Sequence, residues 1–285
     1  MLEAARESRP AAPAPRPIAQ GEGWRLTEFR CQAGPQDRPY EEQHGRFSIA
    51  AVAEGSFTYR ASHGTALLHP GALLLGNAGA CFQCGHEHAK GDRCLALHMT
   101  PAYFEEAATG AAGSSRFRFR QAMLPAGAAT LPLGLMLERG AGRVALAAES
   151  LVATVVERVL SLASGETPAA GLPPHDARRI SRVLRHIEAH AEDALDLDRL
   201  AGIAAMSKYH FLRSFRRAVG APPYRYLLNL RLRRAAQALA HGEEPVASVA
   251  LGAGFGDLST FNRRFRRSFG TTPLGWRRQS RPAAV

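Results

Sequence analysis

The sequence predicts an α+β chain of more than one domain, with a β-rich first part and an all-helical second part. Three observations support this prediction. At 285 residues the chain is longer than the roughly 100–200 residues of a typical domain. Short apolar segments separated by Gly and Pro run from Trp24 to Met99, which is typical of short strands. After residue 176, helical periodicity and an internal repeat take over.

We assign residues 21–163 to the first domain and expect a β-barrel or β-sandwich with a flanking helix. RFSIAAVAEGSFTYR, TALLHPGALLLGNAG and RCLALHM are typical of antiparallel strands. Apolar residues at helical spacing predict the flanking helix over Val144–Ala163. Residues 1–20, rich in Ala, Pro and Arg, predict a disordered leader, and the Gly- and Pro-containing residues 164–176 predict a linker. The second domain is then 177–285.

The net charge of +11 is concentrated in the second domain. Residues 175–285 hold 20 Lys and Arg against 9 Asp and Glu, so the whole positive excess lies there. Such a segment attracts a polyanion, whereas the neutral first part has no electrostatic reason to meet one. No apolar run reaches the roughly 18–20 residues of a membrane span, and the N-terminus lacks the apolar centre of a signal peptide. We therefore expect a cytoplasmic protein without a membrane partner.

The helical part repeats itself at an offset of 50 residues. The recurring positions pair as Phe211 with Phe261, Arg213 with Arg263, Phe215 with Phe265, Arg216 with Arg266, Arg217 with Arg267, Gly220 with Gly270, and Pro223 with Pro273. In each copy a short helix, LDRLAGIAAM or VASVALGAG, precedes a tight turn and a longer helix, SKYHFLRSFRRAVG or LSTFNRRFRRSFG. The repeat predicts two helix-turn-helix units, joined by a long helix over Pro222–Ala240.

The second helix of each unit has the chemistry of a DNA-reading helix. We expect Ser207 and Ser259 to cap its N-terminus and a left-handed glycine to end it. Phenylalanines four residues apart would form a buried stripe, so the arginines would face outward. Arg213 and Arg263 have the bidentate fork that reads guanine in the major groove.

The same residues resemble the DNA-binding domain of AraC/XylS-type regulators, over about Ile180–Arg278. The turn GFGD at 254–257 and the closing FGTTP at 269–273 match that family closely. The resemblance implies two recognition helices in successive major grooves. It implies base contacts from Tyr209, Leu212, Arg213, Ser259, Asn262 and Arg263. For the phosphates we expect contacts from Ser207, Lys208, Arg216, Arg217, Arg266 and Arg267. Leu212 replaces the polar residue often found there and would read a thymine methyl.

The β-rich part resembles the cupin-like sensor domain of many such regulators, with turns at Glu54-Gly55 and Pro70-Gly71. It contains a cluster of candidate metal or redox residues: Cys81, Cys84, His86, His88 and Cys94. Alternation along one strand would put Cys84, His86 and His88 on one face, and a Gly-Asp turn would return Cys94 toward them. Thiolate and imidazole ligands suit Zn²⁺ or another soft to borderline metal. Metal or thiol-redox sensing, ordinary packing and a pocket for a small organic ligand all remain open.

The leading hypothesis is a one-component transcription regulator that is not an enzyme. Its partners would be double-stranded promoter DNA, RNA polymerase, a small effector or metal, and a second copy of the chain. One alternative is a DNA-repair alkyltransferase-like regulator, but the Pro-Cys-His-Arg signature that it needs is missing from the sequence. Another is a cupin-type metal enzyme, but the glutamate expected a few residues after the histidine pair is missing, and Asp92 is the nearest carboxylate that follows the pair.

Overall fold

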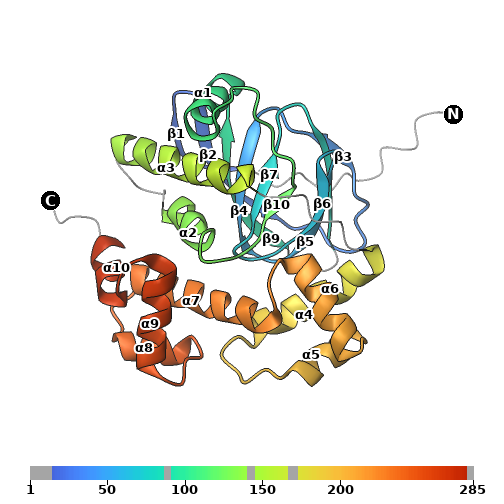
Figure 1. Ribbon diagram of the computed structural model, residues 1–285, viewed down its shortest axis with the longest axis vertical. Helices are drawn as coiled ribbons and strands as arrows, with labels where there is room; N and C mark the ends of the chain where they lie inside the picture. Colours follow the sequence, from blue (N-terminus) through green and yellow to red (C-terminus); the bar gives the residue numbers. More distant parts are fainter. Residues whose placement is uncertain (1–14, 87–90, 140–144, 166–172, 281–285) are drawn as a thin grey trace.

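The computed structural model describes residues 15–86, 91–139, 145–165 and 173–280. Strands gather in the first part of the chain, and helices α4–α10 form the second part beneath them (Figure 1). The predicted combination of a β-sheet N-terminal region and a helical C-terminal region is confirmed.

The strands of the N-terminal region form two antiparallel sheets, a larger one with the order β1-β2-β9-β4-β7-β10 and a smaller one with the order β3-β8-β5-β6. The larger sheet contains β1 (Arg16–Gly21), β2 (Trp24–Cys31), β4 (Phe47–Glu54), β7 (Leu73–Gly76), β9 (Asp92–Met99) and β10 (Met123–Leu124). The smaller sheet contains β3 (Glu41–Gln43), β5 (Phe57–Ala61), β6 (Gly64–Leu68) and β8 (Cys81–Gly85).

The larger sheet is buried on both faces. On one face Ile49 of β4 packs in a core with helices that cover the sheet (Figure 1). On the other face Val52 of the same strand packs with Tyr59 and Leu68 of the smaller sheet. The covering helices are α1 (Pro101–Ala112), α2 (Leu131–Arg139) and α3 (Ala145–Ser164). Burial on both faces explains why β4 is apolar along nearly its whole length instead of alternating.

The C-terminal region has two small cores that share one long helix. Its helices are α4 (Pro174–Ala189), α5 (Leu197–Ala204), α6 (Lys208–Val219), α7 (Pro223–His241), α8 (Val246–Gly252), α9 (Leu258–Phe269) and α10 (Pro273–Ser280). Tyr226 and Leu230 of α7 pack with α4, α5 and α6, whereas Leu232 and Leu239 pack with α8, α9 and α10. The long helix therefore contributes to both cores.

Two predicted boundaries need correction. The disordered leader was expected to reach residue 20, but β1 begins at Arg16 and pairs with β2 around a turn at Gly23, whose φ is 77°. Pairing with a buried neighbour outweighs the Pro- and Ala-rich composition. The linker is also shorter than 164–176, because α3 runs to Ser164 and α4 begins at Pro174, a favoured first helical residue. Residues 1–14 and 166–172 lie outside the described part of the chain.

The two regions contact each other through α4, α6, α7 and α9. The buried Arg233 of α7 forms an ion pair with Glu138 of α2, and it donates to the carbonyl oxygen of Ala53 at 2.7 Å. The hydroxyls of Ser56 and Ser181 are hydrogen-bonded at 3.2 Å, and both residues are buried. The N-terminal region therefore lies directly against the helices that carry the two units.

Among the described residues, none of the helices combines the length and the hydropathy that crossing a membrane requires.

Candidate DNA interface and cysteine-histidine cluster

The first helix-turn-helix unit consists of α5, a turn over residues 205–207, and α6. Asp196 caps α5 by accepting from the backbone N–H of Arg199 at 2.8 Å. Ala205 ends α5 with a φ of 49°, so the chain turns sharply through a left-handed residue. Ser207 caps α6 by accepting from the N–H of His210 at 3.4 Å, which confirms the predicted cap.

The second unit consists of α8, a turn over residues 253–257, and α9. Gly254 has a φ of 87°, and a Cβ there would lie 2.8 Å from Nε of Arg231 and from Cα of Glu192, so the close approach requires glycine. The carboxylate of Asp257 caps α9 by accepting from the N–H groups of Ser259 and Thr260 at 3.1 and 2.7 Å. The prediction that Ser259 is the cap is wrong, because this residue lies inside the first turn.

Both second helices bury their phenylalanines and end on glycine. Phe211, Phe215, Phe261 and Phe265 are fully buried. Gly220 and Gly270 follow the helices with φ values of 78° and 70°, as the left-handed cap requires. The predicted glycine caps and the buried stripe are therefore confirmed, whereas of the two predicted serine caps only Ser207 is.

The opposite faces expose almost all the side chains expected to contact DNA. On α6 and its cap the exposed set is Ser207, Lys208, Tyr209, Arg213, Arg216 and Arg217. On α9 it is Ser259, Asn262, Arg263, Arg266 and Arg267. Tyr209 is 87% exposed, which is unusual for a large aromatic side chain and leaves it available to a partner. An open hollow of about 870 Å³ beside α9 is lined by Asn262 and the three exposed arginines of that helix.

Two residues of the first unit are less accessible to DNA than the sequence suggests. Leu212 is half-buried and lines a cavity of about 290 Å³ with Leu200 and Pro222, so much of its side chain packs between helices. Lys208 forms an ion pair with Asp198, with Nζ and Oδ1 2.6 Å apart, although both side chains remain mostly exposed. A phosphate contact from Lys208 would compete with this carboxylate.

Arg231 of α7 is a positioning residue that the sequence analysis missed. Its guanidinium donates to the carbonyl oxygens of Ala191, Gly254 and Asp193 at 2.6, 2.7 and 2.8 Å. Ala191 and Asp193 follow α4, whereas Gly254 lies in the turn of the second unit. One side chain therefore ties the two units together. Its position within a helix gives no sequence signal, because its partners come from two distant loops.

The structure does not assemble the predicted cysteine-histidine cluster in the predicted way. Cys84 lies on β8 of the smaller sheet and Cys94 on β9 of the larger sheet, so the Gly-Asp turn does not form a hairpin between the two strands. Cys81 is exposed at the start of β8. His86 follows β8 instead of extending it, and His88 lies outside the described residues. The prediction that Cys84, His86 and His88 share one face of a single strand is therefore wrong, because the strand ends before His86.

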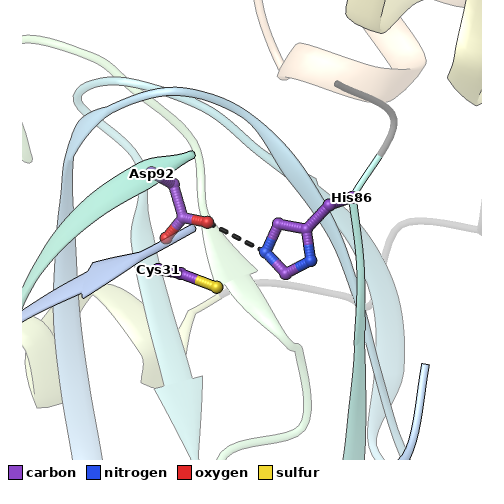
Figure 2. Close-up of side chains that lie close together, drawn as sticks. All are labelled: Cys31, His86 and Asp92. Atoms are coloured by element: carbon purple, nitrogen blue, oxygen red, sulfur yellow. Dashed lines mark hydrogen bonds and ion pairs between the residues drawn. The ribbon is translucent and has the colours of Figure 1, made fainter. Parts of the chain in front are cut away.

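A different set of ligand-type side chains meets between the sheets: Cys31, His86 and Asp92 (Figure 2). One potential ligand atom from each lies within 4.8 Å of the other two. Nε2 of His86 and Oδ2 of Asp92 are 2.9 Å apart, and both side chains are buried. Cys31, the last residue of β2, is paired in register with Asp92, the first residue of β9. This pairing is what brings the thiol to the carboxylate.

The pKa shifts distinguish His86 from two nearby cysteines, Cys84 and Cys94. Burial lowers the pKa of His86, but hydrogen bonds to Asp92 and Cys31 outweigh burial and raise it to about 9. Burial raises the pKa values of the Cys84 and Cys94 thiols, and the nearby Asp92 charge adds to both shifts. These two cysteines therefore stay protonated at neutral pH and behave as small packing groups.

Comparison with known proteins bears on the C-terminal region. Residues 200–279 match the family model described as a helix-turn-helix domain. The chain is 32% identical over 109 residues to the regulatory protein PocR of Salmonella typhimurium, covering 38% of this chain and 36% of PocR. It is 33% identical over 115 residues to the transcriptional activator RhaS of Enterobacter sp., covering 40% of this chain and 41% of RhaS.

Among solved structures, a transcriptional regulator with an AraC-type DNA-binding domain from Chromobacterium violaceum is 28% identical. The match covers 37% of this chain and 95% of that one, with a TM-score of 0.35. The chain thus spans about two fifths of the length of the curated relatives it matches. Within that span, the C-terminal region is similar to the helix-turn-helix domains of these named transcription regulators.

Proposed function

We propose that this protein is a one-component transcription regulator whose C-terminal region binds promoter DNA through α6 and α9. The observation that carries the proposal is the pair of exposed, arginine-bearing helices held by α7 and Arg231. Because Arg231 bonds to both units, their relative orientation is preset, which lowers the entropic cost of engaging one duplex with two helices.

The charge distribution supports DNA as the partner. Residues 175–285 carry the whole positive excess of the chain, and the exposed arginines of α6 and α9 concentrate it on the two expected reading surfaces. We expect Arg213 and Arg263 to make bidentate contacts to guanine, and the arginines nearer the ends of the helices to contact phosphates.

For the N-terminal region we propose a cupin-like sensor, since two antiparallel sheets enclose ligand-type side chains between them. RNA polymerase and a second copy of the chain are proposed as protein partners. This chain would then sense a signal in one region and act on a promoter with the other.

The test is selection of duplexes from a randomised DNA library by the full chain, followed by affinity measurements across a range of salt concentrations. We expect a defined consensus and a steep linear fall of log affinity with log salt, because several phosphates are neutralised. Failure to enrich any sequence, or an affinity that ignores salt, would contradict the proposal.

A further inference from the structure

The three side chains of Figure 2 have the composition of a metal site, although they differ from the set that the sequence suggested. A thiol, an imidazole and a carboxylate are the three ligand types that Zn²⁺ accepts, at roughly 2.0–2.3 Å from the ion. Ligand atoms around one such ion lie roughly 3–4 Å apart. The three atoms already lie within 4.8 Å of one another, so small shifts of the side chains would suffice to place an ion between them.

The local environment fits a site more closely than it fits ordinary packing. The side chains of His86 and Asp92 are only 8% and 6% exposed, which fixes the imidazole against the carboxylate. Phe57 stacks on the His86 ring at a centroid distance of 5.7 Å and walls off one side. Cys31 is half-buried, so a metal ion could reach the three side chains from solvent on its side.

We propose that Cys31, His86 and Asp92 bind a divalent metal ion of borderline softness, with Zn²⁺ as the type case, and that its occupancy changes DNA affinity. Cys31 would supply thiolate, His86 a neutral imidazole and Asp92 a carboxylate oxygen, so binding releases protons and weakens at low pH. Three protein ligands leave one coordination position for water or another small ligand.

The structure offers a short physical connection from this site to the DNA-binding helices, through the turn between β4 and β5. A Cβ on Gly55 would lie 2.4 Å from the carbonyl oxygen of Gly91 and 2.9 Å from Cα of Asp92, so this turn packs directly on the start of β9. The next residue, Ser56, is hydrogen-bonded to Ser181 of α4. Phe57, which follows it, contacts His86.

The same segment also touches the long helix, because Ala53 accepts a hydrogen bond from Arg233 of α7. Residues 53–57 therefore contact metal-site residues or their neighbours on one side, and α4 and α7 on the other. An ion bound by both His86 and Asp92 would replace their 2.9 Å hydrogen bond with a wider ligand spacing, and so would move the surfaces on which these helices rest. This second step rests on the proposed function, and it requires that the two states of the protein differ in DNA affinity.

The site itself is tested with Co²⁺ on the reduced full chain after treatment with a chelator. We expect one equivalent to bind, with a thiolate-to-cobalt charge-transfer absorption that Zn²⁺ abolishes by displacement. Cys31→Ser should lose this absorption. Asp92→Asn should weaken binding at least 10-fold, since even residues that only support metal ligands contribute roughly 10–100-fold.

Cys81→Ser is the matched control, because it removes an exposed cysteine of β8 that lies outside the set of three. It should bind Co²⁺ like the wild type. Circular dichroism of each metal-free variant checks that the fold is kept. The site is overturned if the wild type gives no thiolate absorption, or if folded Cys31→Ser keeps it.

The connection to DNA is tested with a duplex selected by the full chain, measured with and without Zn²⁺. We expect a change in affinity of roughly 5–150-fold in the wild type and none in Asp92→Asn. Zn²⁺ binding that leaves DNA affinity unchanged would overturn the connection. An intact cobalt absorption in a protein that binds no DNA would support the site and contradict the proposed function instead.

Discussion

The two helix-turn-helix units have the same plan but different attachments to the rest of the molecule. In the first unit, α6 lies against the N-terminal region: Leu67 of β6 belongs to its core, and a Cβ on Gly220 would lie 2.4 Å from Cβ of Pro125. In the second unit, α9 contacts α8 and α10 and also α2 of the N-terminal region, whose Leu135 belongs to the core of this unit. A change in the N-terminal region would therefore reach the first unit through β6 and Pro125, and the second through α2 and α7.

The two reading surfaces differ in chemistry as well. The first unit presents Tyr209 and Arg213, with Leu212 half-buried between helices. The second presents Ser259, Asn262 and Arg263, all exposed and all able to form hydrogen bonds. We therefore expect the second unit to discriminate bases by hydrogen bonding, and the first to depend more on shape and apolar contact.

The largest effect should come from breaking the contact between α7 and the N-terminal region. Arg233→Met would leave Glu138 buried without its guanidinium partner, and losing one partner of a buried ion pair costs about 3–5 kcal/mol. Urea unfolding of the full chain measures this loss. Lys208→Met is the control, because its ion pair with Asp198 is exposed and should contribute no more than about 1 kcal/mol. Equal losses in the two variants would mean that the α7 contact is not the stronger one.

Next in size is the effect of removing a base-reading arginine. Arg263→Ala should cost about 1–3 kcal/mol at one base pair and relax specificity there, because a bidentate guanine contact is lost. Arg266→Ala should weaken all sequences alike, since a phosphate contact carries no base information. Affinities for the selected duplex, for its single-base variants and for random DNA separate the two effects. If Arg263→Ala lost affinity equally on all of them, its assigned role would be wrong.

A pH-dependent effect is expected at the first unit. Burial raises the pKa of Glu188 on α4 to about 7, although a hydrogen bond from the Tyr226 hydroxyl opposes the shift. Because the folded state favours the protonated acid, the contribution of Glu188 to stability should be greatest below its ordinary pKa of 4.5 and should fall as pH rises through about 7. Glu188→Gln should remove this fall. Thermal unfolding between pH 4.5 and pH 8 gives the comparison, and identical pH profiles for both proteins would refute it.

The helix-turn-helix units could be predicted because their signals are local. Caps, buried phenylalanines and terminating glycines all lie within one helix or one turn of each other. The one capping error had an available remedy: at the repeat offset of 50, the equivalent of Ser207 is Asp257, which is the residue that caps α9. Placing the serines by residue type instead of by repeat position caused the mistake.

The candidate metal site could not be predicted in the same way, because it depends on strand pairing between distant segments. Cys31 and Asp92 meet only because β2 pairs with β9 in a particular register. His86 reaches them from the end of a strand in the other sheet. Sequence proximity favoured Cys84 and Cys94 instead, and the pairing placed them on different sheets. Arg231 was missed for the same reason.

The most direct test of the central claim, that two helices of one chain read one duplex, changes the spacing within the selected site. Successive major grooves on one face of DNA are one helical turn apart, about 10 base pairs. Inserting about 5 base pairs between the two halves of the consensus would turn the second half to the opposite face. We predict that this insertion abolishes specific binding by the full chain. An insertion of about 10 base pairs is the comparison, because it keeps the two halves on the same face of the DNA. Unchanged affinity for the 5-base-pair insertion would show that only one helix reads the DNA.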